Sequence, residues 1–186
     1  RVDFLKGAMG WRLKRPEHEN QLKKAIGKTS DSLTIFDGTA GMLGDSMIFL
    51  SLGHKVIACE QSKIIYLLIK DACKRAENEL PFLKNLKLVH GNSAEIYKSH
   101  TKSDLVYLDP LYPQTSKSSK RSGDVALLRA AIELESIKDI GDQIFNEFRA
   151  STHKKIILKR PVKAPLICNK INYQIKGKST RFDIYI

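Results

Sequence analysis

The sequence predicts an α/β fold in which a mostly parallel, doubly wound sheet is covered by helices on both faces. Short β-rich apolar runs alternate with segments of helical spacing along most of the chain. Glycine-rich or acidic residues follow several of these runs, and the carboxyl ends of parallel strands are where such sheets bind ligands. The closing segment differs, because it predicts two strands joined by a glycine-containing turn and therefore an antiparallel hairpin.

The first predicted unit consists of a strand, a glycine turn and a helix. LTIFD (33–37) is a short β-rich run and GTAGMLG (38–44) is the turn. An apolar helix is expected to follow over 45–52, and Gly53 is expected to end it. KVIACE (55–60) predicts the second strand.

The second predicted helix begins at Ser62, a typical N-cap, and ends before Pro81. Residues 123–148 predict one or two further helices. The remaining strands are expected at 86–91, 104–109 and 154–159, and the hairpin at 172–186. We therefore expect one folded domain over 31–186, preceded by an N-terminal basic segment over 1–30.

Length and composition favour a single globular domain. The chain has 186 residues, of which 42% are hydrophobic and 28% are charged. Its most apolar run, around 47–52, is too short to span a bilayer and no signal peptide is evident, so we expect a soluble, intracellular protein. The chain begins at Arg1 rather than methionine, which suggests that an N-terminal piece has been removed. Cys59, Cys73 and Cys168 are widely spaced, which argues against a disulfide framework and a structural zinc site, and we expect no metal.

The charge balance favours a polyanionic partner. Lys and Arg total 32 against 20 acidic residues, which gives a net charge of +12 at pH 7. Phosphate contacts and counterion release make nucleic acid a natural partner for such a chain, and a merely basic, soluble surface is the alternative. The basic residues gather in four segments, several of which flank predicted strand ends: 6–15, 117–121, 154–163 and 176–181.

The glycine turn after the first strand is a candidate cofactor site. Gly41 and Gly44 allow the backbone to turn sharply and approach a ligand, between Asp37 at the strand end and Asp45 at the helix start. Glu60 ends the second strand, 23 positions after Asp37, where a carboxylate can accept hydrogen bonds from both ribose hydroxyls of a nucleoside. A plain structural turn and a capping or surface glutamate are the alternatives.

The nucleoside cofactor is expected to be S-adenosylmethionine rather than a dinucleotide. Asp45 stands at the helix start, where a dinucleotide would place its pyrophosphate, and the like charges would repel. S-adenosylmethionine carries no phosphate and ends in an ammonium, a carboxylate and a sulfonium, so nearby acids suit it. Asn92 and Ser93, after the third strand, are able to hydrogen-bond an adenine edge, although both are also routine turn formers.

The fourth predicted strand ends in DPLYP (109–113), which carries the candidate catalytic groups. An exocyclic amino group of a base is a poor nucleophile, because its lone pair is delocalised into the ring. Asp109 and the Pro110 carbonyl would favour the reactive geometry by accepting the two amine hydrogens, and Tyr112 would hold the extruded base by stacking. The alternative is that Asp-Pro merely ends a strand and Tyr112 packs on the core.

These segments also carry a resemblance to a known family. D-P-L-Y-P resembles the Asp/Asn-Pro-Pro-Tyr signature of amino-group methyltransferases, and the whole chain is similar to the bacterial ribosomal RNA small-subunit methyltransferases J. The similarity spans VDFLKGAMGWRLKR, DGTAG, ACEQS, HGNSAEI, VYLDPLYP, LKRPVKAPL and KGKSTRFDIYI. It implies a class I methyltransferase with a Rossmann-like fold, S-adenosylmethionine as methyl donor and a cytoplasmic location. The implied reaction is methylation of the N2 amine of a guanosine near the 3′ end of 16S rRNA.

The resemblance implies cofactor contacts at seven positions, to which the strand end and glycine turn add Asp37 and Gly41. The seven are Gly44, Asp45, Glu60, Gln61, Asn92, Ser93 and Asp109. The family usually has Gly-Leu-Gly-Arg-Asp where this chain has GMLGD (41–45), and Glu-Arg where it has Glu60-Gln61. The contacts at 44 and 61 therefore tolerate these changes only if they are made through the backbone.

RNA contacts are expected from Arg12, Lys14, Arg15, Lys117, Lys120, Arg121 and Arg160, with 16S rRNA or the small ribosomal subunit as partner. The sequence does not predict the oligomeric state. Two other functions remain open: an amino-group methyltransferase acting on DNA, another RNA or a small amine, and a non-catalytic basic RNA-binding module on the same fold. It also remains open whether Asp109 removes a proton or only orients the amine, and whether it serves cofactor, base or both.

Overall fold

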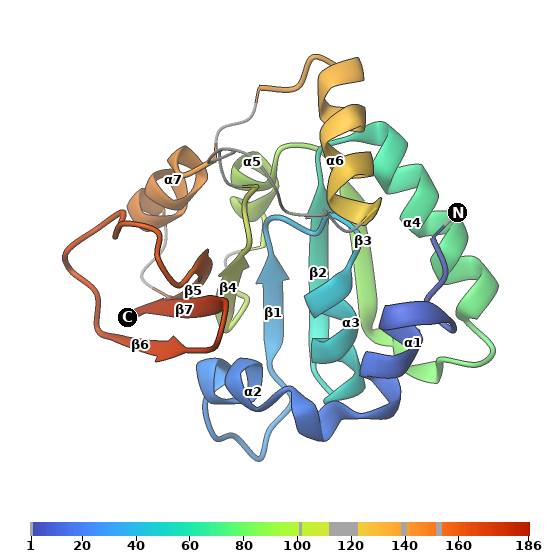
Figure 1. The fold of residues 1–186 in the computed structure, drawn as a ribbon, viewed down its shortest axis with the longest axis horizontal. Coiled ribbons are helices and arrows are strands. Elements are labelled where there is room, and N and C mark those ends of the chain that lie inside the picture. The colour runs from blue at the N-terminus through green and yellow to red at the C-terminus, as the bar shows by residue number, and fades with distance from the viewer. Residues whose placement is uncertain (1, 101, 112–122, 139–140, 152–153) are drawn as a thin grey trace.

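The structure is a computed structural model that describes residues 2–100, 102–111, 123–138, 141–151 and 154–186. Its strands are β1 (Thr34–Asp37), β2 (Lys55–Glu60), β3 (Leu86–His90), β4 (Leu105–Leu108), β5 (Lys155–Pro161), β6 (Tyr173–Lys176) and β7 (Thr180–Tyr185). They form one sheet in the order β3-β2-β1-β4-β5-β7-β6 (Figure 1). β1 to β5 run parallel, whereas β7 is antiparallel to both β5 and β6. The predicted mostly parallel sheet with an antiparallel C-terminal hairpin is confirmed.

The helices of the described residues agree with the prediction in most places and differ in a few. They are α1 (Gly7–Lys14), α2 (Asn20–Ile26), α3 (Gly44–Ser51), α4 (Lys63–Ala76), α5 (Ser93–Tyr97), α6 (Gly123–Leu134) and α7 (Gln143–Ser151), with 3-10 turns η1 (Pro16–His18) and η2 (Pro81–Asn85). The region expected to hold one or two helices contains α6 and α7. The segment before β1, expected only as a basic stretch, folds into α1 and α2. β5 extends two residues beyond its predicted end, because Arg160 and Pro161 still pair with β7.

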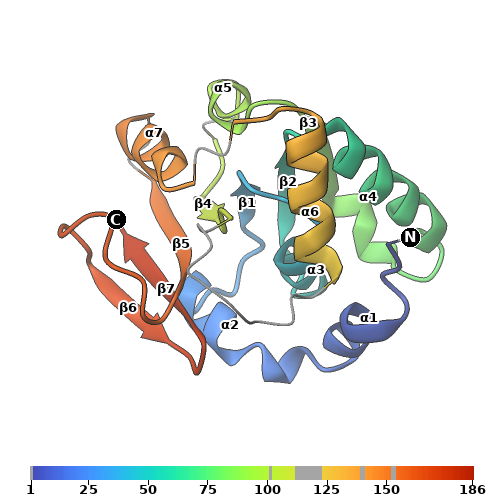
Figure 2. The ribbon, with the colours of Figure 1, turned by 45° about the horizontal axis from the view of Figure 1, so that its top comes forward.

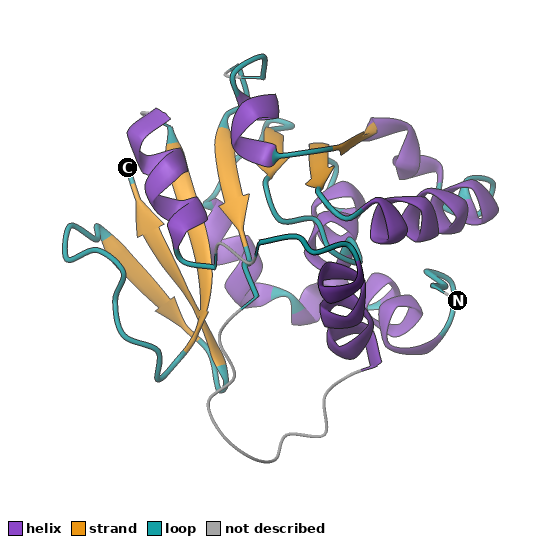
Figure 3. Cartoon of the chain, turned by 90° about the horizontal axis from the view of Figure 1, so that it is seen from above, coloured by secondary structure: helices purple, strands orange, loops and turns teal. Residues whose placement is uncertain are grey.

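Alternate residues of each strand build two cores, one on each face of the sheet. Ile35 and Tyr107 face the core that includes residues of α2, α3 and α4. Their neighbours Phe36, Val106 and Leu108 face the opposite core, which includes residues of α5 and α7. Figures 2 and 3 show α6 on one side of the strand ends and α5 with α7 on the other. The sheet is therefore doubly wound, as predicted.

The start of α4 fixes α6 over the carboxyl ends of the strands. Ser62 is the N-cap, and its Oγ accepts a hydrogen bond from the Ile65 N–H at 3.1 Å. The same hydroxyl donates to the carboxylate of Glu135, which follows α6 and also accepts from the Ile64 N–H. This junction positions α6 as a wall over the ends of β1 and β2.

The N-terminal segment packs on the rest of the fold. Phe4 is 2% exposed and belongs to the core on the α3 side of the sheet. α1 contacts α3, and α2 contacts β6 and β7. The chain before β1 therefore lies against two separate parts of the sheet structure.

Three features of the described residues bear on membrane and metal binding. No described helix combines the length and apolar character needed to cross a bilayer. Cys59, Cys73 and Cys168 are free thiols. The described part of the chain contains no group of three or more His, Cys, Asp or Glu side chains arranged to hold a metal ion.

Candidate active site

A pocket of about 140 Å³ lies at the carboxyl ends of β1 to β4, where a doubly wound sheet is expected to bind ligands. The predicted site residues that line it are Gly41, Glu60, Gln61, Asn92, Ser93, Asp109 and Pro110. Leu128 and Ile132 of α6, together with Ile144 of α7, provide an apolar wall. The pocket therefore combines carboxylate and amide groups with an apolar surface.

The turn between β1 and α3 depends on glycine at two positions. Gly41 has φ +48°, in the left-handed region that glycine adopts without steric cost. Its N–H donates to Glu60 Oε2 at 2.9 Å, which links the turn to the end of β2. A Cβ at Gly38 would lie 2.9 Å from the Leu108 side chain, so the approach of the turn to β4 requires glycine there.

Glu60 is held by backbone groups and keeps acceptor capacity for a ligand. Its Oε1 accepts from the Ser62 N–H at 2.7 Å, while Oε2 accepts from Gly41. Each carboxylate oxygen has a second lone pair, so both remain able to accept a hydroxyl donor. Burial raises the pKa of Glu60 to about 7, although the backbone hydrogen bonds oppose the rise. The oriented carboxylate is suited to binding a ribose diol.

Asn92 and Ser93 line the pocket and also start α5. Asn92 Oδ1 accepts hydrogen bonds from the N–H groups of Ala94 at 2.9 Å and Glu95 at 3.1 Å, which makes it the N-cap. The capping role is the alternative that the sequence left open for Asn92. It fixes the side chain at the rim of the pocket, where both residues remain candidates for adenine contacts.

Asp37 lies beneath the pocket and is not part of its lining. It is 2% exposed, and its carboxylate accepts from the Thr39 N–H at 3.0 Å and from the Ser46 hydroxyl at 2.5 Å. Burial raises the pKa of Asp37 to about 7. The hydrogen bonds of Asp37 therefore hold the turn against α3.

Asp45 lies in an ion-pair cluster with Lys159, Asp109 and Arg12. Lys159 Nζ is 2.7 Å from Asp45 Oδ2 and 2.9 Å from Asp109 Oδ2. Arg12 Nη2 is 2.9 Å from Asp45 Oδ1, and the Tyr107 hydroxyl donates to Asp45 Oδ2 at 2.5 Å. Two cations thus hold two carboxylates at the edge of the pocket.

The pairing of β4 with β5 explains why these side chains meet. Leu108 is opposite Leu158 in the parallel register, so the next residues, Asp109 and Lys159, also lie side by side. Strand alternation turns both toward the face of Tyr107, on which α3 packs. The Asp109 N–H donates to Thr39 Oγ1 at 2.6 Å, which fixes the backbone as well.

Burial and charge act in opposite directions on the two aspartates. Burial alone would raise the pKa of Asp45, but the charges of Lys159 and Arg12 outweigh it and hold this pKa well below its usual value. Burial raises the pKa of Asp109, and the nearby charge of Lys159 opposes that rise. Lys159 is therefore the main group that favours the ionised form of Asp109.

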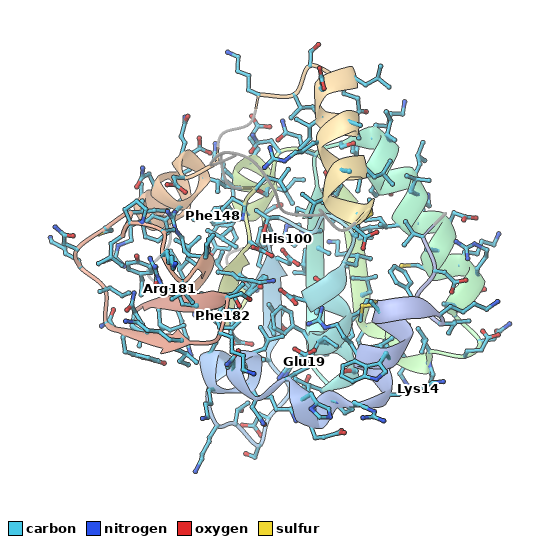
Figure 4. All side chains as sticks on the ribbon, viewed as in Figure 1. Lys14, Glu19, His100, Phe148, Arg181 and Phe182 are labelled. Atoms are coloured by element: carbon cyan, nitrogen blue, oxygen red, sulfur yellow. The ribbon has the colours of Figure 1, made fainter. Side chains whose placement is uncertain are left out.

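Arg12 joins the N-terminal segment to this cluster. Its guanidinium pairs with Glu19, with an Nε to Oε1 distance of 2.7 Å, and donates to the Gly44 carbonyl at 3.2 Å. Gly44 and Asp45 thus contact the N-terminal segment, and neither is among the lining residues of the first pocket. A second pocket of about 230 Å³ lies here, and Glu19 and Phe182, both labelled in Figure 4, are among its lining residues.

The RNA-contact candidates divide into three groups. Lys14, labelled in Figure 4, and Arg15 are exposed, and the Arg15 guanidinium lies 5.3 Å from the ring centre of Trp11. Arg12 is engaged in the ion pairs above, and Arg160 is 3% exposed and paired with Asp142, so neither presents a free charge to solvent. Lys117, Lys120, Arg121 and the catalytic candidate Tyr112 lie outside the described residues.

Sequence reasoning missed the roles of Lys159, Tyr107 and Glu19. In the sequence, Lys159 is one of several basic residues in the segment 154–163. The available signal was strand alternation, which puts Lys159 on the same face of its strand as Ile157, two residues earlier. In the structure this is also the face of Tyr107. Glu19 offered no comparable signal, because it meets Arg12, seven positions away, only through the way the chain turns after α1.

The residues of the first pocket fit S-adenosylmethionine by the chemistry of their donors and acceptors. Glu60 suits the ribose, Asn92 and Ser93 suit the adenine edge, and the side chains of Leu128 and Ile132 suit the face of the base. The sheet order, the glycine turn and this acidic strand end define the class of the protein, a methyltransferase that depends on S-adenosylmethionine.

Comparisons with known proteins agree with this class and specify it. The sequence model of the family described as "Putative SAM-dependent methyltransferase" matches residues 1–186. Ribosomal RNA small subunit methyltransferase J from Desulfotalea psychrophila is 33% identical over 192 residues, covering 100% of this chain and 72% of that protein. The chain belongs to this family of SAM-dependent methyltransferases, which includes the proteins named ribosomal RNA small subunit methyltransferase J.

Solved structures show the same fold. A SAM-dependent methyltransferase from Neisseria gonorrhoeae is 29% identical, with a TM-score of 0.64, and the match covers 100% of this chain and 73% of that one. The 16S rRNA N2 methyltransferase RsmC from T. thermophilus, solved with AdoMet and guanosine, has a TM-score of 0.59 at 13% identity, covering 96% of this chain and 43% of that one. At that identity the second match supports the fold alone.

Proposed function

We propose that this protein transfers a methyl group from S-adenosylmethionine to the N2 amine of a specific guanosine near the 3′ end of 16S rRNA. The observation that carries the proposal is the position of Asp109 and Pro110, which line the cofactor pocket while Lys159 holds the carboxylate. The relative from Desulfotalea psychrophila is named for small-subunit ribosomal RNA, which supports the choice of substrate.

The cofactor half of the reaction rests on residues around the first pocket. Bound S-adenosylmethionine supplies an electrophilic methyl group. Glu60 binds the ribose hydroxyls, and Asn92 and Ser93 bind the adenine edge. The apolar side chains that α6 and α7 contribute to the lining lower the local polarity, which strengthens these hydrogen bonds.

The acceptor half rests on the end of β4. Asp109 and the Pro110 carbonyl accept the two hydrogens of the guanine amine and so orient its lone pair for in-line attack. Tyr112, which lies outside the described residues, is proposed to hold the base by stacking. The proton lost after attack is acidic enough to leave to water, so Asp109 serves as an orienting acceptor.

The RNA is held by basic groups near the strand ends. Lys14 and Arg15 contact phosphates beside the exposed Trp11, and the segment 117–121, which lies outside the described residues, adds Lys117, Lys120 and Arg121. We leave Arg12 and Arg160 out of this surface, because both guanidinium groups are engaged within the fold. The partner is 16S rRNA or the small ribosomal subunit, and the place of action is the cytoplasm.

The test is methylation of defined polymers with labelled donor. Incorporation into 16S rRNA from cells that lack the gene, located by mass spectrometry at one guanosine near the 3′ end, is the expected outcome. If the label appeared in DNA or in another RNA instead, that polymer rather than 16S rRNA would be the substrate. Failure to bind S-adenosylmethionine or its demethylated product in calorimetry would indicate a non-catalytic RNA-binding module.

A further inference from the structure

We propose that Lys159 is a positioning residue for methyl transfer, which holds one oxygen of the Asp109 carboxylate in the ionised state and leaves the other for the target amine. This inference rests on the proposed function of Asp109 as acceptor of an amine hydrogen. It adds a residue from β5 to a site otherwise built from β1 to β4 and the segments that follow them.

The contact between the two side chains is one-sided. Lys159 Nζ lies 2.9 Å from Asp109 Oδ2, and among the described residues Oδ1 has no hydrogen-bond partner. The backbone of Asp109 is fixed separately by its hydrogen bond to Thr39. One carboxylate oxygen is thus anchored and the other is left without a partner among the described residues, in a side chain that lines the pocket.

Asp45 keeps the Lys159 ammonium in place. Lys159 Nζ is 2.7 Å from Asp45 Oδ2, and the other oxygen of Asp45 is bound by Arg12 at 2.9 Å. The Tyr107 hydroxyl also donates to Asp45. Because Asp45 is held from three sides, the ammonium between the two carboxylates has a fixed position, and only 23% of the Lys159 side chain is exposed.

The charges that face Asp109 come from four elements besides its own strand. Asp45 of α3, and Asp37 of β1 in its ionised form, are negative and favour its protonation. Lys159 of β5 and Arg12 of α1 are positive and favour its ionisation. Tyr107 of β4 stays neutral, because burial raises its pKa well above the usual value.

Removing the ammonium therefore has a defined consequence. Burial and the charge of Asp45 would act on Asp109 with only the more distant Arg12 to oppose them, so its pKa would rise. A protonated carboxyl donates at one oxygen and is a weaker acceptor for the amine. The orientation of the carboxylate would also be lost, since Lys159 is its only side-chain partner among the described residues.

The first test measures Asp109 directly and needs no RNA. Carboxyl carbons of aspartate are labelled with ¹³C, the Asp109 signal is assigned from the Asp109→Asn variant, and its titration is followed by NMR. The midpoint is expected at higher pH in Lys159→Met than in the unchanged protein, and near the original value in Lys159→Arg. An unchanged midpoint in Lys159→Met would overturn the inference. If that variant does not fold, Lys159→Gln carries the same prediction with a polar side chain.

The second test measures single-turnover methylation against pH. The acidic limb of the Lys159→Met profile should shift to higher pH, and at pH values below the midpoint the rate should fall about tenfold for each pKa unit of that shift. KM for the RNA and affinity for the demethylated cofactor should stay within about twofold. Lys159→Arg should restore most of the rate. If the activity of Lys159→Met fell only through a higher KM, with no shift of the pH–rate profile, Lys159 would not act through Asp109.

Lys155→Met is the matched control. Lys155 lies on the same strand and projects toward the same face, but its ammonium donates to the Ile26 carbonyl at 2.7 Å and does not touch Asp109. The Asp109 midpoint and the pH profile should not change in this variant.

If the unchanged protein fails to methylate 16S rRNA, the proposed function is wrong, while the NMR titration still decides whether Lys159 sets the ionisation of Asp109.

Discussion

The two halves of the candidate site are built from different kinds of contact. In the cofactor half, Glu60 is bound by Gly41, 19 positions away, and by Ser62, two positions away, and Asn92 caps its own helix. In the acceptor half, Lys159 meets Asp109 across 50 positions and Asp45 across 114. The first half uses turns and helix caps, whereas the second requires β4, β5 and α3 to be assembled.

In the proposed function, this difference separates the residues that bind the cofactor from those that act on the target amine. Backbone donors position Glu60, so the cofactor half depends on local chain geometry. The acceptor half depends on partly buried charged side chains that stabilise one another, where loss of one partner removes a contact from the others. Substitutions in the cofactor half should therefore change affinity, and those in the acceptor half should change the rate or the stability.

The largest expected effect is on transfer by Asp109→Ala. Turnover on 16S rRNA should fall by about 10²- to 10⁴-fold, because the amine loses its acceptor and its orientation. Calorimetric binding of the demethylated cofactor and the thermal transition, measured in parallel, should stay close to those of the unchanged protein. Near-normal turnover would remove Asp109 from the mechanism.

Asp45→Ala should mainly lower stability. Lys159 and Arg12 would lose a shared partner that is 10% exposed, and because both cations are partly exposed the cost should lie near or below the lower end of the about 3–5 kcal/mol of a fully buried pair. Asp71→Ala is the control, since Asp71 forms an exposed pair with Arg75 that contributes about 0–1 kcal/mol. Denaturant unfolding compares the two variants.

The effect of Asp45→Ala on stability should also depend on pH. The pKa of Asp45 in the folded state is below its unfolded value, so its stabilising contribution is present above about pH 4 and is lost as the pH falls toward the folded pKa. The difference in unfolding free energy between Asp45→Ala and the unchanged protein should therefore narrow in acid. If Asp45→Ala and Asp71→Ala lowered the unfolding free energy equally, the ion pairs of Asp45 would stabilise the protein no more than an exposed pair does.

The cofactor half was predictable from the sequence because its signals are local. A glycine turn after a β-rich run, an acid at the next strand end and an Asn-Ser pair after the third strand each occupy a few consecutive residues. All of these segments contribute residues to one pocket, since parallel strands bring their carboxyl ends together. Asp109 and Pro110 were found in the same way.

The acceptor half was only partly predictable, because it depends on register. Strand alternation determines which residues of β5 face α3, but only the pairing of Leu108 with Leu158 places Lys159 beside Asp109. The end of β5 was predicted two residues too early. Arg160 was therefore expected beyond the strand, whereas it lies within it on the face opposite Lys159, where Asp142 pairs with it.

Glu60→Gln should weaken cofactor binding with little effect on the rate at saturation. The neutral amide of Gln would accept weaker hydrogen bonds from the ribose hydroxyls than the carboxylate of Glu60 does. The affinity for the cofactor should therefore fall about tenfold. Because burial raises the pKa of Glu60 to about 7, binding to the unchanged protein should strengthen as the pH rises from 6 to 8 and the carboxylate ionises. Calorimetry across this range should show that the variant has lost the dependence. If cofactor binding to the variant still depended on pH, a group other than Glu60 would be responsible for the pH dependence.

The smallest expected effect is that of Tyr107→Phe, which removes one hydrogen bond and keeps the packing. The Tyr107 ring lies 5.0 Å from that of Phe49 and would stay there, while Asp45 would lose the hydroxyl donor at 2.5 Å. The cost should be about 1 kcal/mol, which lowers Tm by roughly 2–4 °C for a chain of this size.

Tyr185→Phe is the matched control for that measurement. Tyr185 is equally buried, in the core on the other face, but its hydroxyl has no hydrogen-bond partner among the described residues. Removing an unsatisfied buried hydroxyl should leave Tm unchanged or raise it, because the desolvation cost of the group is relieved. Opposite signs for two tyrosine-to-phenylalanine changes would show that the hydroxyl of Tyr107 stabilises the protein through Asp45. Equal changes would mean that the cluster gains nothing from that donor, and that Lys159 and Arg12 alone hold Asp45.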